Sequence, residues 1–580
     1  MLRTELEVQP VEMHPIPRVE PDSRFPRGDF SFRTRSTNLQ RLCREEFDVA
    51  VIGGGATGAG IARDAALRGM KVALIEKGDF AAGSSSKSSK MIHGGLRYLK
   101  QLEIGLVREA LHERAVLLRI APHLVRPIPH LLPAYGGGRK RLELRVGMLG
   151  YEALAGAQTL VPFEELSRSE VLRREPLLNP NDLGGGFVYH DCLVNDARLT
   201  LATIKSAFEQ GAVVANYTEC VRLEHGDGVV TGLRIRDLLT GASGSIQARV
   251  VVNASGAWAD SIRSLAAEGQ KLLRPTKGVH VVVSRKKLNV RQVVAHSTDD
   301  GRAIFVVPRG AFTYIGTTDT DCDESPESVG ADVEDVSYLL GAVNEVFEDV
   351  RLSLKDVLST WAGLRPLIGD AGSPSSISRD YRIEVARNGL VTVVGGKLTT
   401  YRSMAEAVVD EVLIRFFPGS EHRFGEGRTA GMPLPGGRIS DFESYAEGVV
   451  RGVGDRWGLT SRMVERLLRN YGTDYLKILA LGLSRRELLE PLSSDSLVLK
   501  GEVVYAMEDE MAMTLEDFME RRTDLAHFDR DRGMSVVQEV ARLMGDCLGW
   551  GEAETKRQLD RYRHAVTVQV VPGPGRISVS

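Results

Sequence analysis

Several features that define common protein classes are absent from this sequence of 580 residues. Its five cysteines are scattered, odd in number and never spaced as CxxC, which argues against a disulfide framework or a zinc site and favours a reducing compartment. No run of about 18 uncharged apolar residues occurs, and the N-terminus has no apolar signal core, so neither a transmembrane helix nor a secretory signal is expected. With 74 basic and 77 acidic residues the net charge is −3, which excludes a chain that coats nucleic acid.

Glycine, in contrast, is abundant, with 60 residues, so many backbone positions need tight turns or a close approach to a ligand. From Phe47, short β-rich runs alternate with helical patterns as far as about residue 425, which predicts an α/β body. Beyond Pro433 helical periodicity takes over, so residues 431–567 are expected to form a separate helical domain. We interpret residues 1–46, which mix arginine with acidic residues, as a mobile leader, and residues 568–580 as a tail.

A nucleotide-binding pattern opens the α/β body. The run FDVAVI predicts a strand, GGGATG follows at once, and GAGIARDAALRGM continues with helical spacing before KVALIE returns to a strand. Gly53, Gly55 and Gly58 occupy the GxGxxG positions, where glycine permits a tight turn, close approach to a pyrophosphate and close helix packing. Glu76 ends the second strand, where its carboxylate can accept ribose hydroxyls. The sequence therefore predicts a bound dinucleotide with its pyrophosphate at the helix N-terminus.

The fingerprint alone does not separate NAD from FAD, because both carry an ADP half. A Ser/Lys loop, GSSSKSSK at 83–90, runs into MIHGGLRYL and offers N–H and hydroxyl donors along the path of an extended FAD. Two later turns, NASGAW at 253–258 and GGKLTTYR at 395–402, also place small residues at helix starts, and three such segments fit a long, buried FAD better than an exchangeable nicotinamide. Beyond the three glycines and Glu76, the expected FAD contacts are Ala56, Thr57, Lys77, Ser85, Ser86, Ser88, Ser89, Lys90, His93, Gly94, Gly95, Ala254, Gly256, Trp258, Gly396, Lys397, Leu398 and Thr399.

From about Phe47 to the helical domain, these motifs resemble those of the FAD-dependent, quinone-linked glycerol-3-phosphate dehydrogenases. The resemblance rests on the stretch from FDVAVIGGG to HGGLRYLK, on DARLTL at 196, KGVHVVV at 277, IGTTDTD at 315, WAGLRPLIGD at 361, SRDYRI at 378 and GGKLTTYR at 395. It implies oxidation of sn-glycerol 3-phosphate to dihydroxyacetone phosphate, with electrons passed from reduced FAD to a membrane quinone.

The resemblance also implies the fold. It is an α/β fold in which a Rossmann-like FAD-binding domain, of the glutathione-reductase or DAO type, is interleaved with a β-rich substrate domain and followed by the all-helical domain. Within residues 47–430, the FAD-binding domain is expected mainly at 47–125, 195–265 and 355–425. The substrate domain is expected mainly at 126–194 and 266–354.

Flavin-dependent oxidation of a phosphorylated secondary alcohol needs a base for the hydroxyl proton and cations for the phosphate. Guanidinium groups suit phosphate because they bind it through two hydrogen bonds. Arg379 in SRDYRI is expected to line the substrate pocket, and a simple ion pair with Asp380 is the alternative. The other positions that match the family's substrate ligands are Arg97, Tyr98, Arg365, Lys397 and Thr399.

Two histidines are candidates for the catalytic base. His280 in KGVHVVV has an imidazole that titrates near neutrality, and the alternation of its strand turns one face toward a cleft. His93 in MIHGG is the rival, either as the base or as a flavin contact. Arg365 and Lys397 complete the expected catalytic set, with Arg365 able to stabilise the developing alkoxide. The sequence HDC at 190–192 offers two soft ligands without a third and fourth nearby, so no metal is expected.

A quinone acceptor lies in the bilayer, so a chain without a spanning segment must bind the membrane surface. RKRLELR at 139–145, followed by VGMLGYEALAG, is a basic start to an apolar helical stretch that is able to lie in the interface, and an amphipathic helix packed on the body is the alternative. The resemblance implies a cytoplasmic enzyme attached to the inner face of the cytoplasmic membrane. Two other functions stay open, a soluble glycerol-3-phosphate oxidase that uses oxygen and a non-catalytic flavin sensor, and so does the formation of a homodimer.

Overall fold

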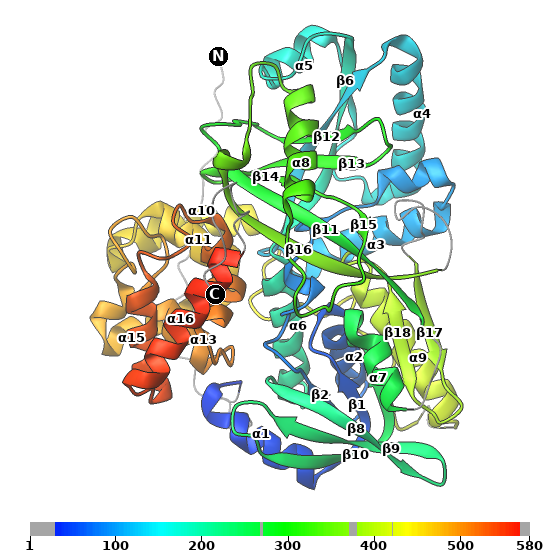
Figure 1. Cartoon of the computed structure of the whole chain (residues 1–580), viewed down its shortest axis with the longest axis vertical. Coiled ribbons are helices and arrows are strands. Elements are labelled where there is room, and N and C mark those ends of the chain that lie inside the picture. Colours follow the sequence, from blue (N-terminus) through cyan, green and yellow to red (C-terminus); the bar gives the residue numbers. More distant parts are fainter. Residues whose placement is uncertain (1–29, 267–270, 370–379, 420–421, 569–580) are drawn as a thin grey trace, which may run out of the picture.

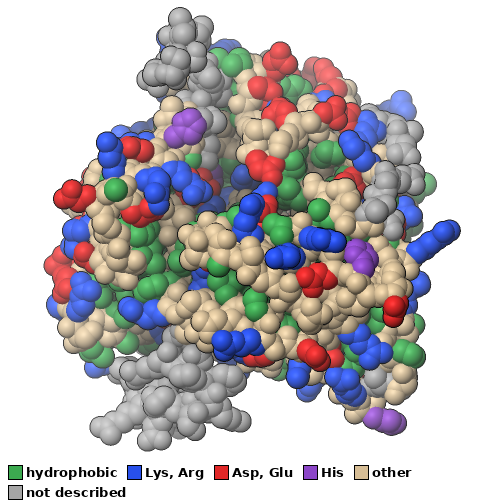
Figure 2. Space-filling view, turned by 60° about the horizontal axis from the view of Figure 1, so that its bottom comes forward, with side chains coloured by type: hydrophobic (Ala, Val, Ile, Leu, Met, Phe, Trp, Pro, Cys, Tyr) green, Lys and Arg blue, Asp and Glu red, His purple; other side chains and the backbone are tan. Residues whose placement is uncertain are grey.

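The computed structural model describes residues 30–266, 271–369, 380–419 and 422–568, which form two β-sheets with their helices and a C-terminal helical domain (Figure 1). In Figure 1 the first sheet occupies the lower half of the molecule, the second sheet the upper half, and the C-terminal helices lie to the left of both. On the face seen in Figure 2, basic and acidic side chains are interspersed, in keeping with the small net charge.

The first sheet is largely parallel and carries the nucleotide-binding pattern. Its strand β1 (Glu46–Ile52) pairs in parallel with β2 (Val72–Ile75) and with β10 (Ser243–Asn253). Both faces of β1 and β2 are buried, which is why FDVAVI and VALI are continuous apolar runs. Across the sheet the order is β17 (Tyr381–Val385), β18 (Val391–Gly395), β10, β1, β2 and β7 (Val213–Ala215), and the antiparallel strands β9 (Val229–Asp237) and β8 (Thr218–Gly226) extend it from β10.

Three helices pack together against this sheet. Helix α2 (Ala56–Leu67) contacts α6 (Asp196–Glu209) and α9 (Tyr401–Phe416), and nearly all of its residues are buried. A Cβ on Gly60 would stand 2.8 Å from the Cβ of Ala405, so the small residues of the GAG segment at 58–60 let α2 and α9 approach closely. A short helix, α7 (Ala259–Leu265), follows β10.

The second sheet is mostly antiparallel and has ten strands among the described residues. Helix α8 (Val333–Val346) packs against it over a core of valine and leucine side chains. On its other face lie η2 (Leu96–Gln101), α3 (Ile104–Ile120) and α4 (Gly137–Ala155), whereas α5 (Arg168–Arg174) packs into the same core as α8. Its strands are β3 (Met91–Ile92), β4 (Val125–Tyr135), β5 (Glu164–Leu166), β6 (Leu183–Val194), β11 (Leu273–Ser284), β12 (Val293–Ser297), β13 (Ala303–Arg309), β14 (Phe312–Gly316), β15 (Thr320–Asp321) and β16 (Val357–Ile368).

One segment differs from the expected division between the two sheets. Residues 357–368 were expected mainly in the FAD-binding domain, yet as β16 they run antiparallel to β11 along almost its whole length. This pairing sets Trp361 opposite His280 and Arg365 opposite Thr276, so it brings two of the sequence motifs together on neighbouring strands.

The C-terminal domain is helical, as expected, and has two hydrophobic clusters of its own. Thr460 caps one helix by accepting a hydrogen bond from the N–H of Met463. The longer elements are α10 (Phe442–Trp457), α11 (Ser461–Tyr471), α12 (Tyr475–Ser484), α13 (Lys500–Glu508), the π-helix η9 (Asp517–Arg522), α14 (Leu525–Phe528), α15 (Val537–Leu548) and α16 (Glu552–Val568).

The expectation of a mobile leader through residue 46 is wrong for its last part. Residues 32–44 form helix α1 (Phe32–Arg44), which a capping box at Ser31 begins. Buried Arg35 donates to the backbone oxygen of Asn216 and forms a 2.6 Å ion pair with Asp237, and Leu42 is completely buried. Helix α1 is therefore part of the folded body, and residues 1–29 lie outside the described part of the chain.

Candidate active site

The turn between β1 and α2 is shaped by its glycines. Gly53 has a φ of +115°, and a Cβ there would stand 2.6 Å from the carbonyl oxygen of Ala254. A Cβ on Gly58 would stand 1.9 Å from the carbonyl oxygen of Gly53, so only glycine lets the helix begin this close to the strand. Gly55 is the N-cap of α2, and as a glycine it has no side chain that could cap the first N–H groups of the helix. Thr57, in the first turn of α2, is half-buried. This is the geometry by which a helix N-terminus receives a pyrophosphate.

Glu76 lies directly against the glycine turn. Its carboxylate accepts hydrogen bonds from the N–H groups of Gly54 and Gly78, each at 2.7 Å. Burial raises the pKa of Glu76, and these two N–H groups oppose the shift. Its ribose-binding role stays a prediction.

Two other expected cofactor contacts, Lys77 and Trp258, bond through their polar atoms to Glu327, which lies on a loop of the second sheet. The exposed ammonium of Lys77 lies 3.2 Å from a carboxylate oxygen of Glu327, and the indole N–H of Trp258 donates to the same oxygen at 2.6 Å. The Trp258 ring also stands 3.3 Å from where a Cβ on Gly83 would be. Glu327 thus joins the turn after β2 to the turn after β10, and Trp258 in turn lies against the start of the Ser/Lys loop.

The Ser/Lys loop (residues 83–90) is held by Asp196, the first residue of α6. Buried Lys90 lies 2.7 Å from one carboxylate oxygen of Asp196, and the hydroxyl of Ser88 donates to the other oxygen at 2.7 Å. Lys90 also donates to the carbonyl oxygen of buried Ser86. The hydroxyl of Ser85 points the other way and accepts from Ala56 N at the start of α2. The side chains of Ser88 and Lys90 therefore order the loop, and Ser85 connects it to the glycine turn.

The HGG segment that follows is anchored by a buried carboxylate. The N–H of Gly94 lies 3.1 Å from the hydroxyl of Tyr151 and 3.3 Å from Asp191, and Asp191 forms a 2.5 Å ion pair with Arg114. Gly95 has a φ of +75°, and a Cβ on it would stand 2.4 Å from the ring of Tyr98. HDC at 190–192 does not act as a lone pair of metal ligands here, because Asp191 holds the backbone of this turn.

Four of the expected substrate residues, with His93, form one group, which we name the Lys397 cluster: His93, Arg97, Tyr98, Lys397 and Thr399. The Lys397 ammonium lies 3.7 Å from the centre of the Tyr98 ring, and the Arg97 guanidinium lies 5.1 Å from the same ring. Thr399 is buried, and its hydroxyl lies 3.2 Å from the backbone nitrogen of His93. A helical turn at 96–101 and the turn after β18 thus meet around the Tyr98 ring.

Lys397 is the least satisfied member of this cluster. Its Nζ atom is buried without a hydrogen-bond partner among the residues that the structure describes. Burial lowers the pKa of the ammonium to about 7, although the nearby Glu103 carboxylate opposes the shift. Burial likewise lowers the pKa of His93 to about 4, so this imidazole is neutral at pH 7. A buried donor without a partner beside a second cation is suited to receive an anion.

A second group, the His280 cluster, consists of Ser89, His280, Trp361 and Arg365. His280 is buried, its Nε2 atom lies 2.9 Å from the hydroxyl of Ser89, and its ring stacks on Trp361 at 4.7 Å. Its Nδ1 atom has no hydrogen-bond partner within the described ranges. Burial, together with the charges of Arg365 and Lys90, holds the pKa of His280 well below its usual value, so the ring is neutral at pH 7.

Arg365 is positioned by the IGTTDTD segment and by one glycine. Its guanidinium pairs with Asp319 at 3.0 Å and donates to the hydroxyl of Thr317 at 2.9 Å. A Cβ on Gly278 would stand 2.3 Å from Nη2 of Arg365, so the missing side chain in KGVH makes room for this guanidinium. Gly278 lies two residues before His280 on the same face of β11, which places the cation beside the imidazole.

The remaining expected site residues are less informative. Gly256 and Gly396 have positive φ values and shape the turns after β10 and β18, and Leu398 is half-buried against α3 and α6 side chains. Arg379 lies outside the described residues.

One stretch of chain, residues 85–98, connects all of these parts. Ser85 contacts the N-terminus of α2, Ser89 contacts His280, His93 contacts Thr399, and Tyr98 contacts Lys397. A single extended path therefore runs from the expected pyrophosphate end to the two cation-bearing clusters.

Sequence reasoning missed three carboxylates that hold the expected site residues: Asp191, Asp196 and Asp319. Each lies within a quoted motif and forms an ion pair, Asp196 with Lys90 and Asp319 with Arg365, both in quoted motifs, and Asp191 with Arg114, which lies outside them. The signal available was an acidic residue in an otherwise apolar or small-residue motif, which must find a cationic partner when it is buried.

The residues present fit FAD, because the glycine cradle has no space for a Cβ at Gly53 or Gly58, the Glu76 carboxylate lies against this cradle, and the buried Lys397 ammonium at the far end of the 85–98 path has no hydrogen-bond partner in the described part of the chain. Among the described residues, no group of three or more histidine, cysteine, aspartate or glutamate side chains is arranged to hold a metal ion. No described helix is both long enough and apolar enough to cross a bilayer.

Comparison with known proteins agrees with this geometry. Residues 48–402 match the family described as FAD dependent oxidoreductase, and residues 427–555 match the C-terminal domain of alpha-glycerophosphate oxidase. The chain is 40% identical over 524 residues to the aerobic glycerol-3-phosphate dehydrogenase of Staphylococcus haemolyticus, covering 88% of this chain and 93% of that protein. It is 38% identical over 535 residues to the enzyme of the same name from Staphylococcus aureus, covering 91% and 95%.

Solved structures show the same relationship. The X-ray structure of glycerol-3-phosphate dehydrogenase from Bacillus halodurans, complexed with FAD, superposes with a TM-score of 0.79 at 33% identity and covers 95% of this chain and 100% of that one. L-alpha-glycerophosphate oxidase from Mycoplasma pneumoniae, at 20% identity and a TM-score of 0.53, shares the fold and covers 67% of this chain and 99% of its own.

These matches confirm the expected DAO-type fold, the β-rich second domain, the helical C-terminal domain and the dependence on FAD. The chain belongs to the FAD-dependent oxidoreductase family and, within it, to the aerobic glycerol-3-phosphate dehydrogenases.

Proposed function

We propose that this chain oxidises sn-glycerol 3-phosphate to dihydroxyacetone phosphate and passes the electrons to a quinone in the membrane. The observation that carries the proposal is the Lys397 cluster, in which a buried ammonium without a partner in the described chain lies over Tyr98 beside Arg97. Two cations held this close together in a largely buried place are costly unless an anion joins them, and a phosphate dianion is such an anion. The names of the relatives, which are glycerol-3-phosphate dehydrogenases, point to the same substrate.

FAD, when bound, accepts the hydride from carbon 2 of the substrate and later gives up its electrons to the acceptor. The residues proposed to hold its ADP half are Gly53, Gly55, Gly58 and Glu76, with the α2 N-terminus facing the pyrophosphate. Ser85 and Ser89 line the path from there toward the His280 cluster.

His280 is proposed as the base that takes the proton from the substrate hydroxyl. Its imidazole is neutral at pH 7 and therefore has a lone pair available, and Ser89 holds Nε2 so that the ring keeps one orientation. The neighbouring Arg365 guanidinium stabilises the alkoxide that forms when the proton leaves. His93 is the alternative base, since it too is neutral and lies within the Lys397 cluster.

The proposed membrane surface is formed by α4 and the turn between η2 and α3. Leu142, Val146 and Leu149 follow one stripe of α4 and are 62%, 62% and 52% exposed. Leu102 and Ile104, on the neighbouring turn, are 80% and 52% exposed. Five exposed apolar side chains on two packed elements are more than a scattered surface distribution and indicate a contact with lipid or with another protein.

The charges around these side chains favour a lipid surface. Arg139, Lys140, Arg141 and Arg145 lie on the same helix, and Arg139 is exposed. Basic residues beside an apolar stripe match the anionic surface of the inner leaflet, so we infer attachment of a cytoplasmic enzyme to the inner face of the cytoplasmic membrane. This arrangement favours a quinone over oxygen as the acceptor.

The acceptor is tested by supplying glycerol 3-phosphate to the purified holoenzyme with either a soluble short-chain quinone or oxygen alone. The proposal expects rapid quinone reduction and little hydrogen peroxide. Stoichiometric peroxide with no acceleration by quinone would instead identify an oxidase.

A further inference from the structure

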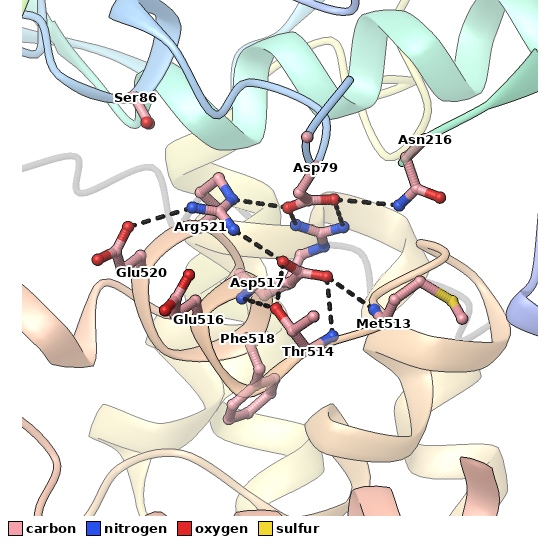
Figure 3. Close-up of polar contacts among 12 residues, drawn as sticks. Asp79, Ser86, Asn216, Met513, Thr514, Glu516, Asp517, Phe518, Glu520 and Arg521 are labelled. Carbon is pink, nitrogen blue, oxygen red and sulfur yellow. Dashed lines mark hydrogen bonds and ion pairs between the residues drawn. The ribbon is translucent and has the colours of Figure 1, made fainter. Parts of the chain in front are cut away.

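The π-helix η9 of the C-terminal domain lies against the turn that follows β2, where Asp79 is completely buried (Figure 3). One carboxylate oxygen of Asp79 is 2.7 Å from Nε of Arg521 and 2.7 Å from Nη1 of Arg522. The other oxygen is 3.0 Å from Nη2 of Arg522. The two cations hold the pKa of Asp79 below its usual value although burial opposes this, so the carboxylate stays ionised.

Both arginines are fixed from behind as well. Arg521 forms a second ion pair with Asp517 at 2.8 Å, and Arg522 donates to the backbone oxygen of Glu510 at 2.8 Å. In Figure 3, Asn216, which directly follows β7, reaches the far side of the Asp79 carboxylate. Because each guanidinium group is bonded to Asp79 on one side and to η9 or Glu510 on the other, its orientation is restricted, and η9 holds Asp79 in a fixed position.

The clamped residue belongs to the segment that braces the glycine turn. Phe80, the next residue, has a ring atom 2.9 Å from where a Cβ on Gly54 would stand, and the N–H of Ala81 donates to the carbonyl oxygen of Gly54 at 3.0 Å. Glu76, three residues before Asp79, accepts from the N–H of Gly54. Residues 76–81 therefore hold Gly54 by both its N–H and its carbonyl group.

The same π-helix also lies beside the Ser/Lys loop. Lys87 in this loop is close enough to Glu520 and Glu516 for both carboxylates to raise its pKa, against a larger lowering caused by burial. Ser85, two residues earlier, accepts from the first helical N–H of α2. The C-terminal domain thus borders the two segments, 76–81 and 83–90, that enclose the N-terminus of α2.

π-Helices are rare, and they are frequently found at functional sites. Buried ion pairs, in turn, are weak evidence of net stability, and in some proteins they specify one geometry. The π-helix and the buried ion pairs occur together where the C-terminal domain contacts the segment that braces the glycine turn.

We propose that Arg521 and Arg522 are positioning residues through which the C-terminal domain fixes the FAD-binding turn and slows the loss of FAD. The proposal rests on the placement of FAD at the β1–α2 turn under the proposed function. In this proposal the C-terminal helical domain helps to retain FAD, and it does so through the contact of its two arginines with Asp79.

A second ion pair between the same domains provides a matched control. Lys205 on α6 lies 3.3 Å from Asp474 and 2.8 Å from the hydroxyl of Tyr505, and within the described ranges no hydrogen bond or ion pair joins these three residues to segments 76–81 or 83–90. Breaking this pair weakens the domain contact without touching the cofactor turn. This control variant therefore distinguishes a weaker contact between the domains from a displaced FAD-binding turn.

The experiment follows FAD release from the full-length holoenzyme after dilution, by the rise in flavin fluorescence, together with the thermal midpoint. Arg522→Gln and Arg521→Gln are expected to release FAD about tenfold faster or more, with Arg522→Lys in between because it keeps the charge but not the double hydrogen bond. Lys205→Met is expected to lower the thermal midpoint and to leave the release rate unchanged.

The arginine proposal is overturned if folded Arg522→Gln and Arg521→Gln release FAD at the wild-type rate, or if Lys205→Met accelerates release as much for the same loss in thermal midpoint. Gly55→Val distinguishes this failure from a failure of the cofactor placement. If Gly55→Val also keeps its FAD, the placement itself is wrong, whereas rapid loss from Gly55→Val alone contradicts only the role of the arginines.

Discussion

The imidazole of His280 lies flat against the indole of Trp361, with ring centres 4.7 Å apart and planes 9° from parallel. The stacking fixes the ring plane, and the bond from Nε2 to Ser89 fixes its rotation within that plane. A general base that keeps one orientation needs no reorganisation before it accepts a proton.

Replacing His280 by alanine is expected to lower kcat by about 100-fold to 10,000-fold, the usual contribution of a general base. The flavin spectrum should stay unchanged, because no glycine-turn contact is lost. Steady-state kinetics of His280→Ala and His93→Ala side by side check the assignment. A collapse of kcat in His93→Ala with near-normal turnover in His280→Ala would transfer the role to His93.

Arg365→Ala should reduce kcat/KM by about 100-fold or more, because a charge-assisted contact to the substrate is lost, while FAD stays bound. Flavin absorbance and dye-coupled kinetics measure both effects. Unchanged kinetics would remove Arg365 from the site.

Gly278→Ala offers an independent check on Arg365, since its Cβ would stand 2.3 Å from the guanidinium and must displace it. We expect kcat/KM to fall by up to about 100-fold, as displacement of a positioned group often does. Gly341→Ala, in α8, is the control, because nothing lies within 4 Å of its Cβ position. Equal, small effects of the two substitutions would show that the space at Gly278 is not used in this way.

Lys397 predicts a pH dependence of substrate binding. Its pKa of about 7 in the substrate-free protein lies below the ordinary lysine value, so the ammonium loses its proton as the pH rises through 7. Affinity for the phosphate dianion should therefore fall above about pH 7 in the wild-type protein. Lys397→Arg should keep affinity to higher pH, because a guanidinium stays charged, and Lys397→Met should bind weakly at every pH. Identical pH profiles of KM for wild type and Lys397→Arg would contradict this role.

The membrane surface is tested with three exposed side chains of α4. Changing Leu142, Val146 and Leu149 to serine should reduce co-flotation with anionic liposomes by about tenfold or more, since each buried aliphatic side chain contributes about 1.5 kcal/mol or more. The control is Leu483→Ser on α12, a residue that is 76% exposed on the C-terminal domain. If only the control lowers liposome binding, the membrane surface lies elsewhere.

The cofactor turn could be predicted from the sequence because its signal is local. The glycines at 53, 55 and 58, the flanking strands and Glu76 all lie within one short stretch, and the structure places them together. Patterning also indicated the helical C-terminal domain, because helical periodicity needs no knowledge of distant contacts.

The partners of the site residues could not be predicted in the same way. Lys90 was expected to contact FAD, yet its ammonium pairs with Asp196, which is 106 positions away in the sequence. Arg365 depends on Asp319 and Gly278, which reach it only because β11 pairs with β16 and lies next to β15. Strand pairing over such separations is set by the whole sheet and has no short sequence signature.

The N-terminal helix was missed for a related reason. Charges of both signs made residues 1–46 resemble a solvated segment, whereas α1 is fixed by Arg35 with Asp237 and by buried Leu42. Arg35 and Asp237 are 202 positions apart, and Leu42 packs in a cluster that includes side chains of β8, β9 and β10, so composition does not reveal these contacts.

The central claim is tested most directly by adding glycerol 3-phosphate to the purified holoenzyme without oxygen and following the flavin absorbance in the blue. The proposed function predicts that the yellow colour bleaches upon addition of sn-glycerol 3-phosphate and returns when a soluble quinone is added. A flavin spectrum that stays oxidised with this substrate would leave the fold and the cofactor intact and contradict the proposed reaction.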